Sequence, residues 1–199
     1  MIKAIAIGVS AGGAQALDKL LPQLPSDFGA PIIVVQHVLE NSDVYLANHL
    51  NRESALSVKV AEERERMLPG HAYIAPAHYH LLVEDDSTFS LSADPPVRFS
   101  RPSIDVLFMS AADAFQNELV GIVLTGANSD GAAGLSTIKA NGGIAIVQDP
   151  ATADVSLMPQ AAIEATDADA ILNLQEIAQY LRELDRQQNE SGPAIAPQP

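Results

Sequence analysis

The feature that most constrains the fold is a recurring unit in which a short apolar run ends at a turn and leads into a helix. Residues 3–9 form such a run, which stops at the corner Gly8-Val-Ser-Ala-Gly-Gly13 before apolar residues recur at helical spacing from Ala14 to Leu21. A second run, Pro31 to His37, precedes another helical stretch. Continuous Val and Ile runs between helices are typical of a parallel sheet covered on both faces. The sequence therefore predicts an α/β fold with a doubly wound, mostly parallel sheet.

The pattern changes between Leu56 and Leu91, where four shorter strands alternate with turns. Their turns, Pro69-Gly70 and residues 84–86, favour antiparallel hairpins at an edge of the main sheet. The other expected strands are 119–125, 143–148 and 170–174, and the other expected helices are 44–50, 103–112, 132–141, 158–165 and 175–187. We expect one domain over residues 1–187 and a flexible tail over 188–199, which mixes polar residues with three prolines.

Composition excludes several classes of function. A net charge of -14 opposes binding to nucleic acid or to an anionic membrane, so a protein or small-molecule partner is expected. The absence of cysteine excludes disulfides, thiolate metal sites and a cysteine nucleophile. No apolar run is long enough to insert into a membrane, and we expect a cytoplasmic protein.

Three reactive side chains follow strands whose carboxyl ends should meet at one edge of the sheet. Ser10 stands in the first glycine-rich corner, where its hydroxyl would rise above the sheet beside the amides of the next helix. His37 ends the second long strand and could take the proton of a serine. Asp130 follows the 119–125 strand and could orient the imidazole. Together they predict a Ser-His-Asp triad.

Each of these residues has a simpler interpretation. A glycine-rich corner also binds phosphate, a histidine at a strand end is often structural, and Asp130-Gly131 is a common turn pair. His71, His78 and His80 lie close together in sequence but lack a familiar ligand spacing, so we expect no metal and no other cofactor. Arg98 and Arg101 are interpreted as solvated, with contact to an acidic partner as the alternative.

Taken together, the segments resemble the catalytic domain of the CheB-type family of chemotaxis protein-glutamate methylesterases. The residues that carry the resemblance are Ile7-Gly-Val-Ser-Ala-Gly-Gly13, Val34-Val-Gln-His37, Leu68-Pro-Gly-His-Ala-Tyr-Ile-Ala-Pro76, Arg101-Pro-Ser-Ile-Asp-Val-Leu-Phe108, Leu124-Thr-Gly126, Asp130-Gly-Ala-Ala-Gly134, Gln148-Asp149 and Met158-Pro159. Their order and spacing are specific, although no single segment is.

The resemblance implies that Ser10 is the nucleophile, His37 the base and Asp130 its orienting acid, with backbone amides near Ala11 and Ala127 binding the oxyanion. It implies a substrate, the methylated helical cytoplasmic region of a chemoreceptor or a similar protein. The family usually has a receiver domain ahead of this region. None is expected here, which leaves control by a separate receiver protein as one possibility.

Two positions depart from the family pattern. Ala11 stands where a hydroxyl residue is common, and Ala127-Asn128 stands where the family commonly has Met-Gly. Besides the methylesterase, the alternatives are a glutamine deamidase that uses the same site, a regulatory binding module without strong catalysis, and a nucleotide-binding protein.

Overall fold

The computed structural model describes residues 1–37 and 42–190. Seven parallel strands form one sheet in the order β3-β4-β2-β1-β7-β8-β9, and β5 and β6 form a separate antiparallel pair. The strands are β1 (Ala4–Val9), β2 (Ile32–Gln36), β3 (Ser57–Val60), β4 (His71–Ile74), β5 (His80–Val83), β6 (Phe89–Ser92), β7 (Leu119–Val123), β8 (Ile144–Gln148) and β9 (Ala170–Leu172).

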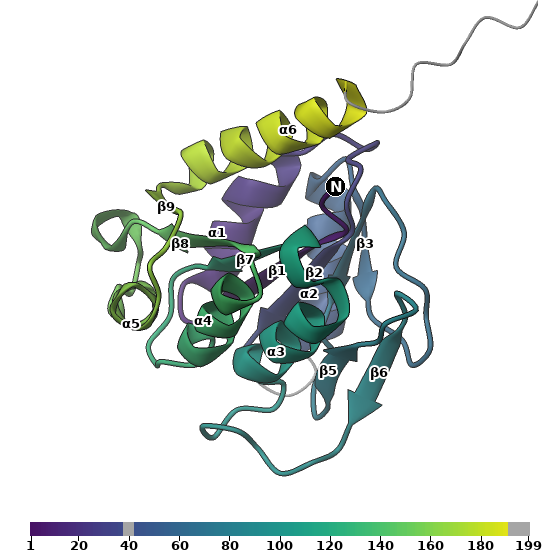
Figure 1. The fold of residues 1–199 in the computed structure, drawn as a ribbon. Helices are drawn as coiled ribbons and strands as arrows, with labels where there is room; N and C mark the ends of the chain where they lie inside the picture. The colour runs from purple at the N-terminus through teal and green to yellow at the C-terminus, as the bar shows by residue number, and fades with distance from the viewer. Residues whose placement is uncertain (38–41, 191–199) are drawn as a thin grey trace, which may run out of the picture.

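Helices cover both faces of the sheet (Figure 1). One face packs against α1 (Gly13–Leu20), α2 (Ser42–Glu53) and α6 (Leu174–Glu190). The other face packs against α3 (Ile104–Phe115), α4 (Ala132–Ala140), α5 (Leu157–Ala165) and the β5–β6 hairpin. Short 3-10 turns lie at Leu21–Gln23, Gln116–Glu118 and Pro150–Thr152. The predicted fold class is therefore confirmed.

The central strand β1 presents different side chains to the two faces. Ile5, Ile7 and Val9 point into the core beneath α1, α2 and α6, whereas Ala4 and Ala6 lie in the core beneath α3. Gly8 lies on the same face as the small side chains of Ala4 and Ala6, and a Cβ at Gly8 would come within 2.3 Å of Ile104 Cγ2. Because successive strand side chains alternate between faces, this pattern lets α3 approach the sheet closely.

Two details differ from the expectation. β3 and β4 belong to the main sheet and run parallel, so only β5 and β6 form a hairpin, and that hairpin is separate from the sheet edge. The turn residues Pro69-Gly70 precede β4 at the end of a longer connection and do not join two antiparallel strands. The hairpin interpretation of β3 and β4 was wrong because local turn chemistry does not reveal which strands pair.

The carboxyl-terminal helix α6 also extends beyond its expected end, from Gln187 to Glu190. Residues 191–199 of the predicted tail lie outside the described residues. No helix within 1–37 and 42–190 is long and apolar enough to cross a membrane.

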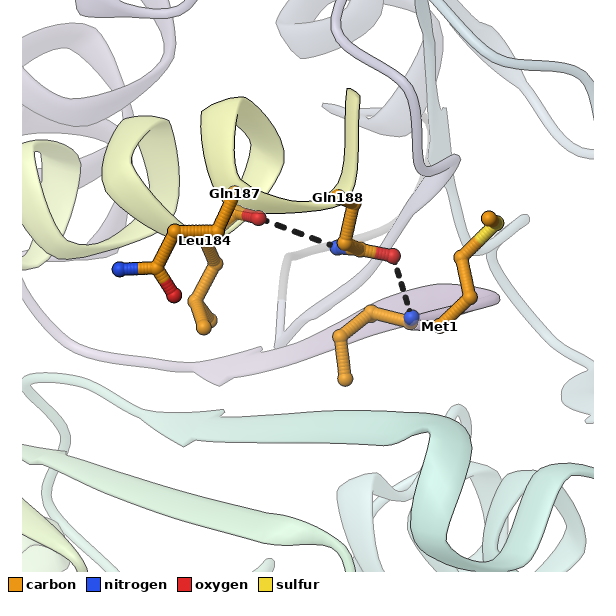
Figure 2. A pocket seen from close by; sticks show the side chains of 5 residues that line it. Met1, Leu184, Gln187 and Gln188 are labelled. Carbon is orange, nitrogen blue, oxygen red and sulfur yellow. Dashed lines mark hydrogen bonds between the residues drawn. The ribbon is translucent and has the colours of Figure 1, made fainter. Parts of the chain in front are cut away.

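A pocket of about 360 Å³ lies where α6 meets the start of the chain, and Figure 2 shows its lining. The Gln188 side chain accepts a hydrogen bond from the Ile2 amide at 2.5 Å and donates one to the Leu184 carbonyl at 3.4 Å. Since Ile2 precedes β1, this pocket faces the amino edge of the sheet, opposite the edge where Ser10 follows the strand. The hydrogen bond between Gln188 and Ile2 connects α6 to the segment just before the first strand.

Helices α3 and α4 lie side by side on one face of the sheet (Figure 1). Gly134 of α4 lies against the first half of α3. A Cβ at Gly134 would lie 2.5 Å from Phe108 Cβ, 3.1 Å from Asp105 Cα and 3.2 Å from the Asp105 carbonyl oxygen. Two of these three atoms are backbone, so the contact cannot be relieved by turning a side chain.

Gly134→Ala should therefore destabilise the protein by about 1–3 kcal/mol through overpacking, although alanine in a helix interior normally gains about 0.5–1 kcal/mol over glycine. Urea unfolding measures the difference, with Ser136→Ala on the same helix as the control. A variant as stable as the parent protein would show that α3 and α4 are not held at this distance.

Candidate active site

Ser10 and His37 lie beside each other because they follow neighbouring parallel strands in register. Val9 pairs with Gln36 across β1 and β2, and the His37 amide donates to the Val9 carbonyl at 3.1 Å. On the other side of β1, the Ser10 amide donates to the Thr125 carbonyl at 2.9 Å. The strand order diverges on either side of β1, so loops from β1, β2 and β7 meet at this edge.

His37 contacts Asp130 across this edge, with 2.8 Å between imidazole Nε2 and carboxylate Oδ2. A carboxylate accepts, so the neutral imidazole carries its proton on Nε2 and keeps a lone pair on Nδ1. That lone pair faces the Asn128 side-chain nitrogen at 3.2 Å. The Ser10 hydroxyl, which is partly exposed, forms no hydrogen bond with the residues that the structure describes.

Asp130 is fully buried and accepts four hydrogen bonds. Oδ2 accepts from His37 and from the Ile104 amide at 2.8 Å, while Oδ1 accepts from the Ser103 hydroxyl at 2.9 Å and from the Asp105 amide at 3.0 Å. Burial alone would raise the pKa of Asp130, but the bonds from His37, the two α3 amides and Ser103 outweigh it and hold the pKa below its ordinary value. Asp130 is thus kept as an anion at the N-terminus of α3.

Asp105, in the first turn of α3, accepts hydrogen bonds from amides at the start of α4. Its Oδ1 accepts from the Gly131 amide at 3.0 Å and the Gly134 amide at 2.7 Å. Each helix therefore begins beside a carboxylate supplied by the start of the other. Burial raises the pKa of Asp105, and the nearby Asp130 charge raises it further, against the lowering effect of the amides and Arg98.

Gln36 contributes a contact that sequence reasoning missed. Its side-chain nitrogen donates to the Ser10 carbonyl and to the His37 carbonyl, both at 2.9 Å. The buried Oε1 has no hydrogen-bond partner among the described residues and lies where a Cβ at Gly13 would come within 1.9 Å. Gln36 therefore links the backbone of the two strand ends, and the corner needs glycine at position 13.

The two residues expected to supply oxyanion donors, Ala11 and Ala127, are both exposed at this edge. Within the described part of the chain, neither amide is used in a hydrogen bond. Gly12, at the start of α1, has φ of 78°, a left-handed conformation that favours glycine. Both amides are thus available to an oxygen placed above Ser10, and their role stays a prediction.

A cavity of about 200 Å³ next to His37 is lined by the loop that precedes α3. Phe99 is fully exposed on this loop and has φ of 65°. The loop is held by Arg98, which donates to Asp105 at 3.2 Å and Ser129 at 3.0 Å, and by Arg101, which donates to the Ala93 and Asp94 carbonyls. Arg98 keeps about half of its side chain exposed while making these intramolecular bonds, so both arginines hold the loop in addition to any contact with solvent.

The remaining histidines have separate surroundings. His80 is buried, where its Nδ1 accepts from the Ser103 amide and its Nε2 lies 3.2 Å from the Pro95 carbonyl oxygen. His71 stacks on Tyr73. Among residues 1–37 and 42–190, no group of three or more His, Asp or Glu side chains is arranged to hold a metal ion.

Asp130→Asn should destabilise the protein by about 1–3 kcal/mol at pH 7, because an amide has one acceptor oxygen and leaves an α3 amide without a partner in either orientation. A carboxyl group with a lowered pKa stabilises the fold above its unfolded pKa, and this contribution is lost as the pH falls through the folded value.

The stability difference between the parent protein and Asp130→Asn should therefore narrow below about pH 4. Urea unfolding at a series of pH values measures it. A difference that stays constant down to pH 3 would contradict the assigned role of the Asp130 charge.

Comparison with known proteins identifies the family of this chain. The family model described as CheB methylesterase matches residues 5–181. The crystal structure of the CheB methylesterase catalytic domain of Thermotoga maritima is similar over 92% of this chain and 99% of that one, with a TM-score of 0.90 and 36% identity.

Two relatives of different length are also similar. A protein of Leptospira interrogans is 52% identical over 184 residues, covering 92% of this chain and 95% of the relative. It is provisionally named a protein-glutamate methylesterase/protein-glutamine glutaminase. The "Protein-glutamate methylesterase/protein-glutamine glutaminase" of Clostridium acetobutylicum is 37% identical, and the matched region covers 93% of this chain and 54% of that protein. This chain belongs to the CheB methylesterase family.

Proposed function

We propose that this protein hydrolyses methyl esters of glutamate side chains through Ser10, His37 and Asp130, and that the same site deamidates glutamine side chains. The observation that carries the proposal is the 2.8 Å contact between His37 and the buried anion Asp130, at a strand end adjoining Ser10. A buried carboxylate that orients an imidazole beside a serine is the arrangement that activates a hydroxyl nucleophile. The names of the relatives indicate the two substrates, a glutamate methyl ester and a glutamine side-chain amide.

In the first half of the reaction, Ser10 Oγ forms a bond to the side-chain carbonyl carbon while its proton passes to His37. Because Nε2 is bonded to Asp130, the nitrogen that accepts this proton is Nδ1. The carbonyl π electrons move to the oxygen, and the amides of Ala11 and Ala127 are the donors proposed to stabilise it. Collapse of this intermediate breaks the bond to the leaving group, which takes the proton from His37 and departs as methanol or ammonia.

In the second half, water attacks the acyl-enzyme while His37 accepts one of its protons. The tetrahedral intermediate then releases Ser10, which regains its proton, and the glutamate side chain leaves as a carboxylic acid that ionises. Asp130 stays ionised throughout and stabilises the imidazolium, consistent with its lowered pKa. Esterase and deamidase therefore differ only in the leaving group of the first half.

The proposed partner is a methylated helical region of a chemoreceptor or a similar protein, and the proposed location of the reaction is the cytoplasm. The cavity next to His37 is bordered by Phe99, Ser100 and Arg101, and its volume of about 200 Å³ suits a single side chain presented on a protein surface. Phe99 has 103% relative exposure, so burying its ring against a substrate would contribute apolar contact.

Ser10→Ala should lower kcat by about 10⁴-fold or more, because the nucleophile is lost while the fold is unchanged. Methanol release from a methylated receptor fragment measures this, and circular dichroism checks the fold. Ammonia release from an unmethylated fragment tests the deamidase in the same preparations. Turnover that survives in Ser10→Ala would contradict the triad, whereas a parent protein that releases neither methanol nor ammonia would favour a role as a binding module.

Phe99→Ala should raise KM for a receptor fragment by about 3- to 10-fold, the effect of losing one modest apolar contact, with little change in kcat. Met109→Ala is the control, since Met109 is an apolar residue that is partly exposed, at 39%, but does not line the cavity. Equal KM values for the two variants would show that Phe99 does not contact the substrate.

A further inference from the structure

The side chain of Asn128 lies between the imidazole and the loop that leads to Asp130. Its nitrogen is 3.2 Å from His37 Nδ1, and its oxygen accepts a hydrogen bond from the Asp130 amide at 3.1 Å. The second bond fixes the orientation of the side chain, because turning the amide over would place its NH₂ group against the Asp130 N–H. The nitrogen of Asn128 is therefore the atom that faces His37.

This contact occupies the lone pair that the proposed reaction needs. Nε2 donates its hydrogen bond to Asp130, so Nδ1 is the acceptor on the neutral ring. Asn128 donates to that same nitrogen, while the Ser10 hydroxyl has no hydrogen bond among the described residues. Once His37 has taken the serine proton, the N–H of Nδ1 would point at the NH₂ group of Asn128, which is unfavourable.

We propose that Asn128 is a positioning residue that restrains the resting site by occupying His37 Nδ1, and that it must turn away before Ser10 can transfer its proton. The inference rests on the proposed triad and adds a conformational step to it. Asn128 directly follows Ala127, whose amide is the proposed oxyanion donor. Substrate bound at the Ala127 amide would therefore contact the loop that holds Asn128 against His37.

The variants that test the restraint separate the two bonds of Asn128. Asn128→Ser keeps an oxygen that can accept from the Asp130 amide, as serine does in local turns, but is too short to reach His37 at the same time. Asn128→Ala removes both bonds. Asn128→Asp keeps the turn and places a carboxylate beside Nδ1, which would favour a proton there. Asn117→Ser, at an exposed position on the 3-10 turn before β7, is the matched control.

The first measurement is the rate at which diisopropyl fluorophosphate labels Ser10, followed by intact mass spectrometry. This reagent is small and needs only the activated serine, so substrate contacts do not enter. Asn128→Ser should be labelled about 2- to 10-fold faster than the parent protein, the size of effect expected from removing one hydrogen bond to the base. Asn128→Asp should be labelled more slowly, and Asn117→Ser should match the parent.

The second measurement does not depend on catalysis. In ¹⁵N-labelled protein, the Nδ1 resonance of neutral His37 should move in Asn128→Ser toward the position of an imidazole nitrogen that accepts no hydrogen bond. The resonance in Asn117→Ser should not move. Thermal unfolding of every variant shows whether the fold is kept.

The outcomes distinguish this inference from the proposed function. A parent protein that is not labelled at Ser10 would contradict the triad, while the Nδ1 resonance would still test the contact with Asn128. Labelling of the parent at Ser10, with Asn128→Ser labelled no faster or with its Nδ1 resonance unchanged, would overturn the restraint and leave the triad intact. Faster labelling of Asn128→Ser together with the moved resonance supports it.

Discussion

The geometry of the site depends on the exchange of carboxylates between α3 and α4. Asp130, just before α4, accepts the first amides of α3, and Asp105, in the first turn of α3, accepts the first amides of α4. A helix N-terminus carries unsatisfied N–H groups and a partial positive charge. Each carboxylate accepts hydrogen bonds from the opposite helix and compensates its charge. Neither helix can slide along the other without leaving buried polar groups unpaired, and this fixes the position of Asp130.

The same exchange determines which imidazole nitrogen is used. Asp130 Oδ2 is shared between the Ile104 amide and His37 Nε2, so Nδ1 is the nitrogen that remains for the proton transfer proposed from Ser10. In the serine protease triad the carboxylate binds Nδ1 and the serine faces Nε2. The proposed mechanism uses the ring in the opposite sense, with the proton accepted by the nitrogen nearer the strand backbone. Gln36 supports this placement by joining the carbonyls of Ser10 and His37.

Much of this could be predicted from the sequence because the governing signals are local. Val and Ile runs followed by helical spacing identified the parallel sheet, and a strand end is visible as the point where such a run meets Ser10 or His37. Strand pairing is a long-range property, so β3 and β4 were mistaken for hairpin strands. The roles of Asp105, Gln36 and Arg98 were missed for the same reason, since each binds a partner that only the folded chain brings near. Asp105, at the second residue after the Ser103 cap, had the one available signal, an acidic residue in a first turn.

The two-sided character of β1 has a consequence for how the protein can change over time. Substitutions beneath α1, α2 and α6 act on a core of branched side chains that can rearrange, and they leave the supports of the site in place. Beneath α3, where Ala4, Ala6 and Gly8 allow the helix to lie close, added volume would lift the helix whose first amides hold Asp130. Sequence drift should therefore be tolerated unequally on the two faces of one strand, and attempts to stabilise the protein without loss of turnover should begin on the face with the isoleucines.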